Sequence, residues 1–305
     1  MNTNRTRLWV WAWPALLFSA ACSRPLRTTP PQYQEAESLL GIVAEFQRYR
    51  HADLYRFPYP RDLSGQNVFK ATLVRLSNYQ TLYPNRYGEL IAFTRGEAYT
   101  RLAEYSTAIR FCEEAAAAGG ELQKRAAENA QRLKEFVQAT ALPSEAQSLS
   151  QFQKGLEERI ERCRQLAERY DKTRPWGTLS WCEYEQAEAD LAEFLWANRQ
   201  VTRGGAERAV ERLEAIRKRH SESKNVYQHT LRLGDWHLEL ATEYATLFPP
   251  ERSMFDWENF ERWTARAKSL YLEVAQSFGA DERTEAAGKL AALEALEHRI
   301  RNENR

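Results

Sequence analysis

The chain has 305 residues and a formal net charge of +1, with 43 Lys and Arg against 42 Asp and Glu. A balance this even excludes a strong overall attraction to nucleic acid or to anionic lipid. Val occurs 9 times and Ile 6 times, whereas Ala, Leu, Glu, Gln and Arg are plentiful. The plentiful residues lose little side-chain freedom in a helix, so the composition predicts an all-α fold.

The first residues have the pattern of an export signal. Arg5 and Arg7 form a basic head, and residues 8–21 form a short apolar stretch. A membrane-spanning helix needs about 20 apolar residues, so the stretch fits a cleaved secretory signal better than a membrane span. We therefore predict that residues 1–21 are removed, which leaves a chain with a net charge close to −1.

Ala20-Ala21-Cys22 resembles the lipobox of bacterial lipoproteins, with Ser19 where that family commonly has Leu. The resemblance implies a diacylglycerol thioether on Cys22, usually with a third acyl chain on its amine. Several acyl chains hold a protein stably on a membrane. Ser23 stands where many Gram-negative families use Asp for inner-membrane retention, which implies an outer-membrane address facing the periplasm. An ordinary cleaved signal with an incidental cysteine, and an uncleaved anchor, remain as alternatives.

Residues 22–32 are polar and rich in proline, which predicts an extended tether. Two amphipathic helices are expected next, over residues 34–56 and from Ser64 to about Pro84. The Pro-containing segment 57–62 separates them.

The segment 86–118 resembles a tetratricopeptide repeat, a helix–turn–helix unit of 34 residues. Its matching positions are Gly96, Tyr99, Ala103, Tyr105, Ala108, Cys112 and Ala115. The resemblance implies that Gly96 allows two helices to approach closely. It also implies a right-handed solenoid whose concave face binds extended peptides, and on this chain that face is Leu90, Phe93, Glu97, Thr100 and Arg101.

Further helices are expected along the rest of the chain, to a total of about ten. A helix over 121–142 is followed by Pro143-Ser144-x-x-Gln147, which we interpret as a stop and a capping box. Pro175 and Gly177 mark the best internal boundary, so the repeats divide into 33–175 and 176–305. The remaining apolar periodicities predict helices over 149–170, 181–200, 206–220, 226–247, 264–278 and 281–300.

An aromatic insert lies within residues 248–263. Its large side chains are Phe255, Trp257, Phe260 and Trp263. Aromatic residues are enriched in the binding hot spots of interfaces. They are also mostly well buried, so packing onto the neighbouring helix pair is the alternative.

Cys112, Cys163 and Cys182 remain besides Cys22. A disulfide between Cys163 and Cys182 is one alternative for an exported chain, and small buried thiols are the other. The cysteine spacings do not match a zinc site. His229 and His237 lie about two turns apart on one helix, too far to share a metal, so neither a metal nor a cofactor is expected.

No nucleophile elbow, phosphate-binding loop or metalloprotease motif occurs, so we expect a protein that is not an enzyme. The signal and the repeats predict a lipid-anchored scaffold or adaptor for envelope proteins. Its plan is similar to that of the lipoprotein in the outer-membrane β-barrel assembly machine. The alternatives are a peptidoglycan-acting enzyme or its activator, and a solute-binding lipoprotein. The sequence leaves the oligomeric state open.

Overall fold

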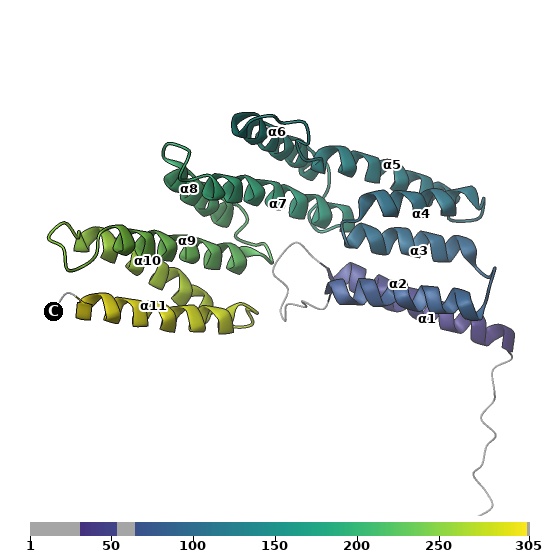
Figure 1. Ribbon diagram of the computed structural model, residues 1–305. Coiled ribbons are helices and arrows are strands. Elements are labelled where there is room, and N and C mark those ends of the chain that lie inside the picture. Colours follow the sequence, from purple (N-terminus) through teal and green to yellow (C-terminus); the bar gives the residue numbers. More distant parts are fainter. Residues whose placement is uncertain (1–30, 54–64, 304–305) are drawn as a thin grey trace, which may run out of the picture.

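The computed structural model describes residues 31–53 and 65–303, and this part of the chain is helical without strands, as predicted (Figure 1). Cys22, the export signal and the segment 57–62 lie outside the described residues. The helices are α1 (Pro31–Ala52), α2 (Gly65–Leu82), α3 (Gly88–Arg101), α4 (Tyr105–Ala117), α5 (Gln123–Thr140), α6 (Leu149–Glu168), α7 (Pro175–Ala197), α8 (Gly205–Arg219), α9 (Val226–Leu247), α10 (Trp257–Ala275) and α11 (Arg283–Glu303).

Each described helix packs on the helix that follows it in the sequence. In Figure 1, α1 to α5 occupy the right side of the molecule, α7 to α11 the left side, and α6 the top. An amphipathic helix cannot bury its apolar face alone, and stacking on both neighbours buries it. The arrangement therefore follows from the periodic apolar stripes of the sequence.

The helix pair expected within residues 86–118 is present as α3 and α4. A methyl group added at Gly96 would lie 2.7 Å from the Cys112 sulfur, so the two helices approach as closely as expected. A similarly close approach occurs between α9 and α10, where a methyl group at Gly234 of α9 would lie 2.6 Å from the ring of Tyr271 in α10. Glycine at these points allows the backbone of one helix to reach the side chains of the next.

One expected helix cap and one expected helix start are displaced. The N-cap of α6 is Ser148, whose hydroxyl accepts a hydrogen bond from the Gln151 backbone N–H at 3.2 Å, and not Ser144. α7 begins at Pro175, six residues before the expected Trp181. Proline suits the first position of a helix because the N–H that it lacks has no partner there.

α10 also begins early, at Trp257 instead of Thr264, because the aromatic insert supplies its first two turns. Asp256 caps this start and accepts a hydrogen bond from the Asn259 backbone N–H at 3.2 Å. Caps of this kind satisfy one of the donors that a helix leaves free at its first turn.

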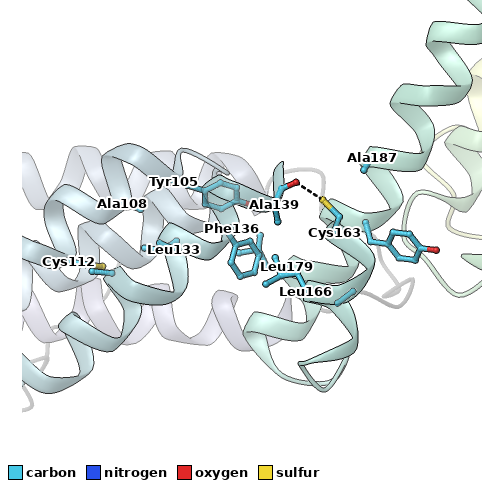
Figure 2. Packing of buried hydrophobic residues seen from close by; sticks show 13 residues of the cluster. Tyr105, Ala108, Cys112, Leu133, Phe136, Ala139, Cys163, Leu166, Leu179 and Ala187 are labelled. Carbon is cyan, nitrogen blue, oxygen red and sulfur yellow. Dashed lines mark hydrogen bonds between the residues drawn. The ribbon is translucent and has the colours of Figure 1, made fainter. Parts of the chain in front are cut away.

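The apolar core is continuous across residue 175. One cluster joins Tyr105 of α4 and Phe136 of α5 to Cys163 of α6 and Leu179 of α7 (Figure 2). Cys112, Cys163 and Cys182 are all free thiols, so the disulfide alternative is wrong in this structure. Burial raises the pKa of the Cys163 thiol to about 11, and its sulfur lies 3.4 Å from the Ala139 carbonyl oxygen. A thiol held neutral in this way is a packing residue, not a nucleophile.

Charged side chains join the two sides of the molecule. Asp53, which follows α1, accepts a hydrogen bond from Lys224 in the α8–α9 loop at 2.7 Å and pairs with Arg101 of α3 at 3.3 Å. Glu185 of α7 is buried and accepts a hydrogen bond from Ser223 of the same loop at 2.6 Å, which ties α7 to this loop within one side of the molecule. The Asp53–Lys224 pair therefore links the two sides.

Candidate functional site

A groove of about 760 Å³ lies between α8 and α10, and α9 forms its floor. Drug-sized and peptide side-chain sites commonly fall within this range of volumes. Its lining residues are Ala206, Glu207, Val210 and Glu211 of α8, His237 and Leu240 of α9, and Arg262, Trp263, Ala265, Arg266 and Ser269 of α10.

The helical periodicity of α8 and α10 explains why these residues face the groove. On α8, Ala209 and Leu213 are buried in the core, which turns Ala206 and Val210 toward the groove one turn apart. The core-facing residues of α10 are Ala267, Leu270, Tyr271 and Val274. Residues 262, 265, 266 and 269 follow the adjacent stripe at spacings of three and four, and they form the opposite wall.

The two walls carry opposite charges. Glu207 and Glu211 are exposed on α8, and Arg262 is exposed on α10. The Arg262 guanidinium lies 5.7 Å from the centre of the Trp263 ring. Arg266 donates a hydrogen bond to Glu214 at 2.7 Å, which bridges the two walls. An apolar floor between charged rims is suited to an amphipathic ligand.

His237 lies in the floor of the groove with both ring nitrogens shielded from solvent and without a hydrogen-bond partner among the described residues. Burial and, to a smaller extent, the nearby Arg266 lower the pKa of its imidazole from 6.5 to about 4, against the opposing effect of Glu214. The side chain is therefore neutral at pH 7, with one hydrogen-bond donor and one acceptor.

The unpaired histidine leads to a pH-dependent stability. The folded-state pKa of His237 is about 4, below the unfolded value of 6.5. The unfolded chain therefore takes up the proton first as the pH falls. The buried neutral His237 makes its full contribution to stability above pH 6.5, and this contribution is lost as the pH falls toward 4. Between pH 7 and pH 4, we expect urea unfolding to show that the wild type loses about 2 kcal/mol more stability than His237→Gln, after allowance for partial solvent screening.

The comparison with His237→Gln isolates this histidine, because the other histidines are present in both proteins. Equal losses of stability in the two proteins would show that the imidazole of His237 is not buried as a neutral group.

The residues expected to form a peptide-binding face do not line the groove. They lie on α3, where the chain's own helices contact them. Phe93 packs on Ala115 and Ala126, and Leu90 packs on a cluster from α1 to α3. Thr100 donates a hydrogen bond to the Gly96 carbonyl at 2.7 Å.

The two charged members of this face are also engaged. Glu97 pairs with Arg50 of α1 at 3.0 Å and accepts a hydrogen bond from Gln47 at 2.8 Å. Only 4% of the Arg101 side chain is exposed, in its contact with Asp53. The residues of α1 that cover this face are about fifty positions away in the sequence, so no local pattern identifies them.

The four insert aromatics come together in one cluster. Phe255 and Phe260 are buried with ring centres 5.6 Å apart, and Trp257 lies 4.8 Å from Phe255. Trp263 contacts Tyr244 of α9 at 5.4 Å. The insert aromatics therefore pack onto the neighbouring helices, which was the alternative to an exposed binding surface. Trp263 also lines the groove, so one face of its ring is available to a ligand.

His229 and His237 have separate environments on α9. His229 lies 2.8 Å from buried Glu185, whereas His237 is in the groove floor. No group of three or more His, Cys, Asp or Glu side chains arranged to hold a metal was found among the described residues. The sequence signal that pointed to the groove was present but faint: Ala206 and Val210 form a second apolar stripe beside the core stripe of α8.

Comparisons of the chain with models of known families, with curated proteins and with solved structures gave no match. Among the described helices, none combines the length and the apolar character that crossing a bilayer requires. The function of the groove is therefore inferred from its own residues.

Proposed function

We propose that this protein is a lipid-anchored scaffold or adaptor of the bacterial outer membrane, which faces the periplasm and binds other envelope proteins. The observation that carries the proposal is the α8–α9–α10 groove, because it presents apolar side chains between charged rims on a rigid helical stack. Interfaces commonly have this anatomy, with an apolar centre and a polar rim. The lipobox pattern that ends at Cys22 supports the anchor and the compartment.

The stacked helices support the proposal that the fold is a solenoid of tetratricopeptide-like helix pairs. Successive helices contact each other from α1 to α11, and close glycine contacts recur in the pairs α3–α4 and α9–α10. Repeat proteins of this kind present extended surfaces to partners without a catalytic centre. Among the buried glutamates, Glu97 and Glu185 are engaged by Arg50 and by Ser223, and neither lines the groove.

Affinity purification from gently solubilised envelopes tests the scaffold. We expect the tagged wild type to recover at least one envelope protein, as quantified by mass spectrometry under several detergents. In Val210→Lys, a cation would stand among the apolar side chains of the groove, so we expect recovery to fall about tenfold. Val201→Lys is the matched control, because it makes the same change at a loop position that is 74% exposed and outside the groove.

Absence of any envelope partner under all detergents contradicts the scaffold. Equal recovery by wild type and Val210→Lys contradicts the groove as its binding surface and leaves the scaffold standing.

A further inference from the structure

The lining of the groove indicates what form of chain it accepts. It spans residues 206–211 of α8 and 262–269 of α10, which corresponds to a length of about 10 Å, or about two helical turns. The walls are helices, whose backbone groups are bonded within each helix except for the first N–H groups of α8, near Ala206 and Glu207. An extended peptide would therefore find few backbone partners here, whereas a helix brings its own backbone bonds and needs only side-chain contacts.

The acidic wall is only partly compensated within the chain, because Glu207 lies in the first turn of α8, where the helix dipole favours a negative charge. Glu207 and Glu211 are one turn apart on α8, and neither has an ion pair among the described residues. Two like charges at this spacing destabilise a helix by a few tenths of a kcal/mol. Cationic side chains from outside the chain would relieve this repulsion.

The basic wall differs from the acidic wall because one of its two arginines already has a carboxylate partner. Arg262 is exposed and contacts only the ring of Trp263 among its described interactions, whereas Arg266 is already bonded to Glu214. One free guanidinium therefore stands opposite two free carboxylates, with Val210, Leu240 and Trp263 between them.

We propose that the groove binds an amphipathic helix of another protein that has an apolar stripe flanked by basic residues on one side and acidic residues on the other. The apolar stripe packs on Val210, Leu240 and Trp263. The basic flank meets Glu207 and Glu211, and the acidic flank meets Arg262. This inference rests on the proposed scaffold function and specifies the chemistry of its partner. Complementary charge of this kind sets specificity more than affinity.

Two designed helical peptides of about 18 residues, long enough to fold on binding, provide the test. They share one leucine stripe. One has lysines on one flank and glutamates on the other, and the second has glutamates on both flanks. Each carries fluorescein, and binding to the full chain is followed by anisotropy. We expect the wild type to prefer the mixed peptide about tenfold.

The double variant Glu207→Lys, Glu211→Lys makes both walls basic. Both positions are exposed, so the fold should tolerate the change. We expect the preference to reverse, so that this variant binds the doubly acidic peptide about tenfold more tightly than the mixed one. Binding by the variant would itself show that it is folded.

Four outcomes overturn the proposal. Neither peptide binds, or both proteins prefer the same peptide. A wild-type dimer in light scattering that the double variant abolishes would assign the groove to a second copy of the chain. A fluorescent fatty acid that binds the groove and is not displaced by the mixed peptide would assign it to an acyl chain. If the affinity purification recovers an envelope partner equally well with the wild type and with Val210→Lys, the scaffold function stands and only the proposal for the groove fails.

Discussion

Gly177→Ala is expected to lower the free energy of unfolding by about 3 kcal/mol, although alanine is the better helix former. Gly177 is buried in the first turn of α7. A methyl group there would overlap the carbonyl oxygen of Asp171 in the preceding turn. That carbonyl accepts a hydrogen bond from the Arg174 N–H at 2.9 Å, and Thr173 donates to the Asp171 side chain, so the turn cannot move aside freely.

Gly288→Ala is the matched control. Gly288 lies in α11, where an added methyl group would have no neighbour within 4 Å. We expect this substitution to stabilise the protein by about 1 kcal/mol, the usual gain from replacing a helical glycine. Urea unfolding of the two variants should therefore give shifts of opposite sign. Shifts of the same sign would mean that the α6–α7 turn does not pack against α7 as described.

Cys22→Ser is expected to move most of the protein from the membrane fraction to the soluble periplasmic fraction. The reason is that the substitution removes the thiol that the proposed acyl chains require. Several chains hold a protein stably on a bilayer, whereas a chain without them has no comparable affinity, so the membrane-bound share should fall about tenfold or more. Incorporation of labelled palmitate should be lost at the same time.

Cys182→Ser makes the same atomic change inside the helical stack and serves as the control. Cys182 is a free thiol on α7 whose pKa burial raises to about 12, so it should have no part in anchoring. This variant should remain on the membrane. If Cys22→Ser fractionates like the wild type, the lipoprotein interpretation is wrong. A wild type that is already soluble would favour the ordinary secretory signal instead.

The helices were largely predictable because their apolar residues recur at helical spacing. The prediction for residues 226–247 agrees with α9 at both ends. The displaced cap of α6 and the displaced starts of α7 and α10 have a common physical cause. Pro175, Ser148 and Asp256 begin or cap helices at positions where the sequence offers several plausible caps, and packing decides among them.

The groove was not predictable to the same degree. Its lining comes from three helices, and each contributes side chains from beside its core stripe. The helical pattern of the sequence indicates which residues share a face of one helix. It does not indicate which faces of separate helices meet, and for that reason the expected face on α3 is covered by α1.

By itself, the sequence determined that the chain is helical, where most helices lie, and that residues 1–22 have the pattern of a lipoprotein signal. Composition, periodicity and short motifs are local properties, and those conclusions depend on nothing more. The tertiary structure alone decided that the thiols are free, that the insert aromatics pack around Tyr244, and that α8, α9 and α10 leave a groove between oppositely charged walls. These features depend on contacts between residues distant in sequence, which are fixed only when the helices pack.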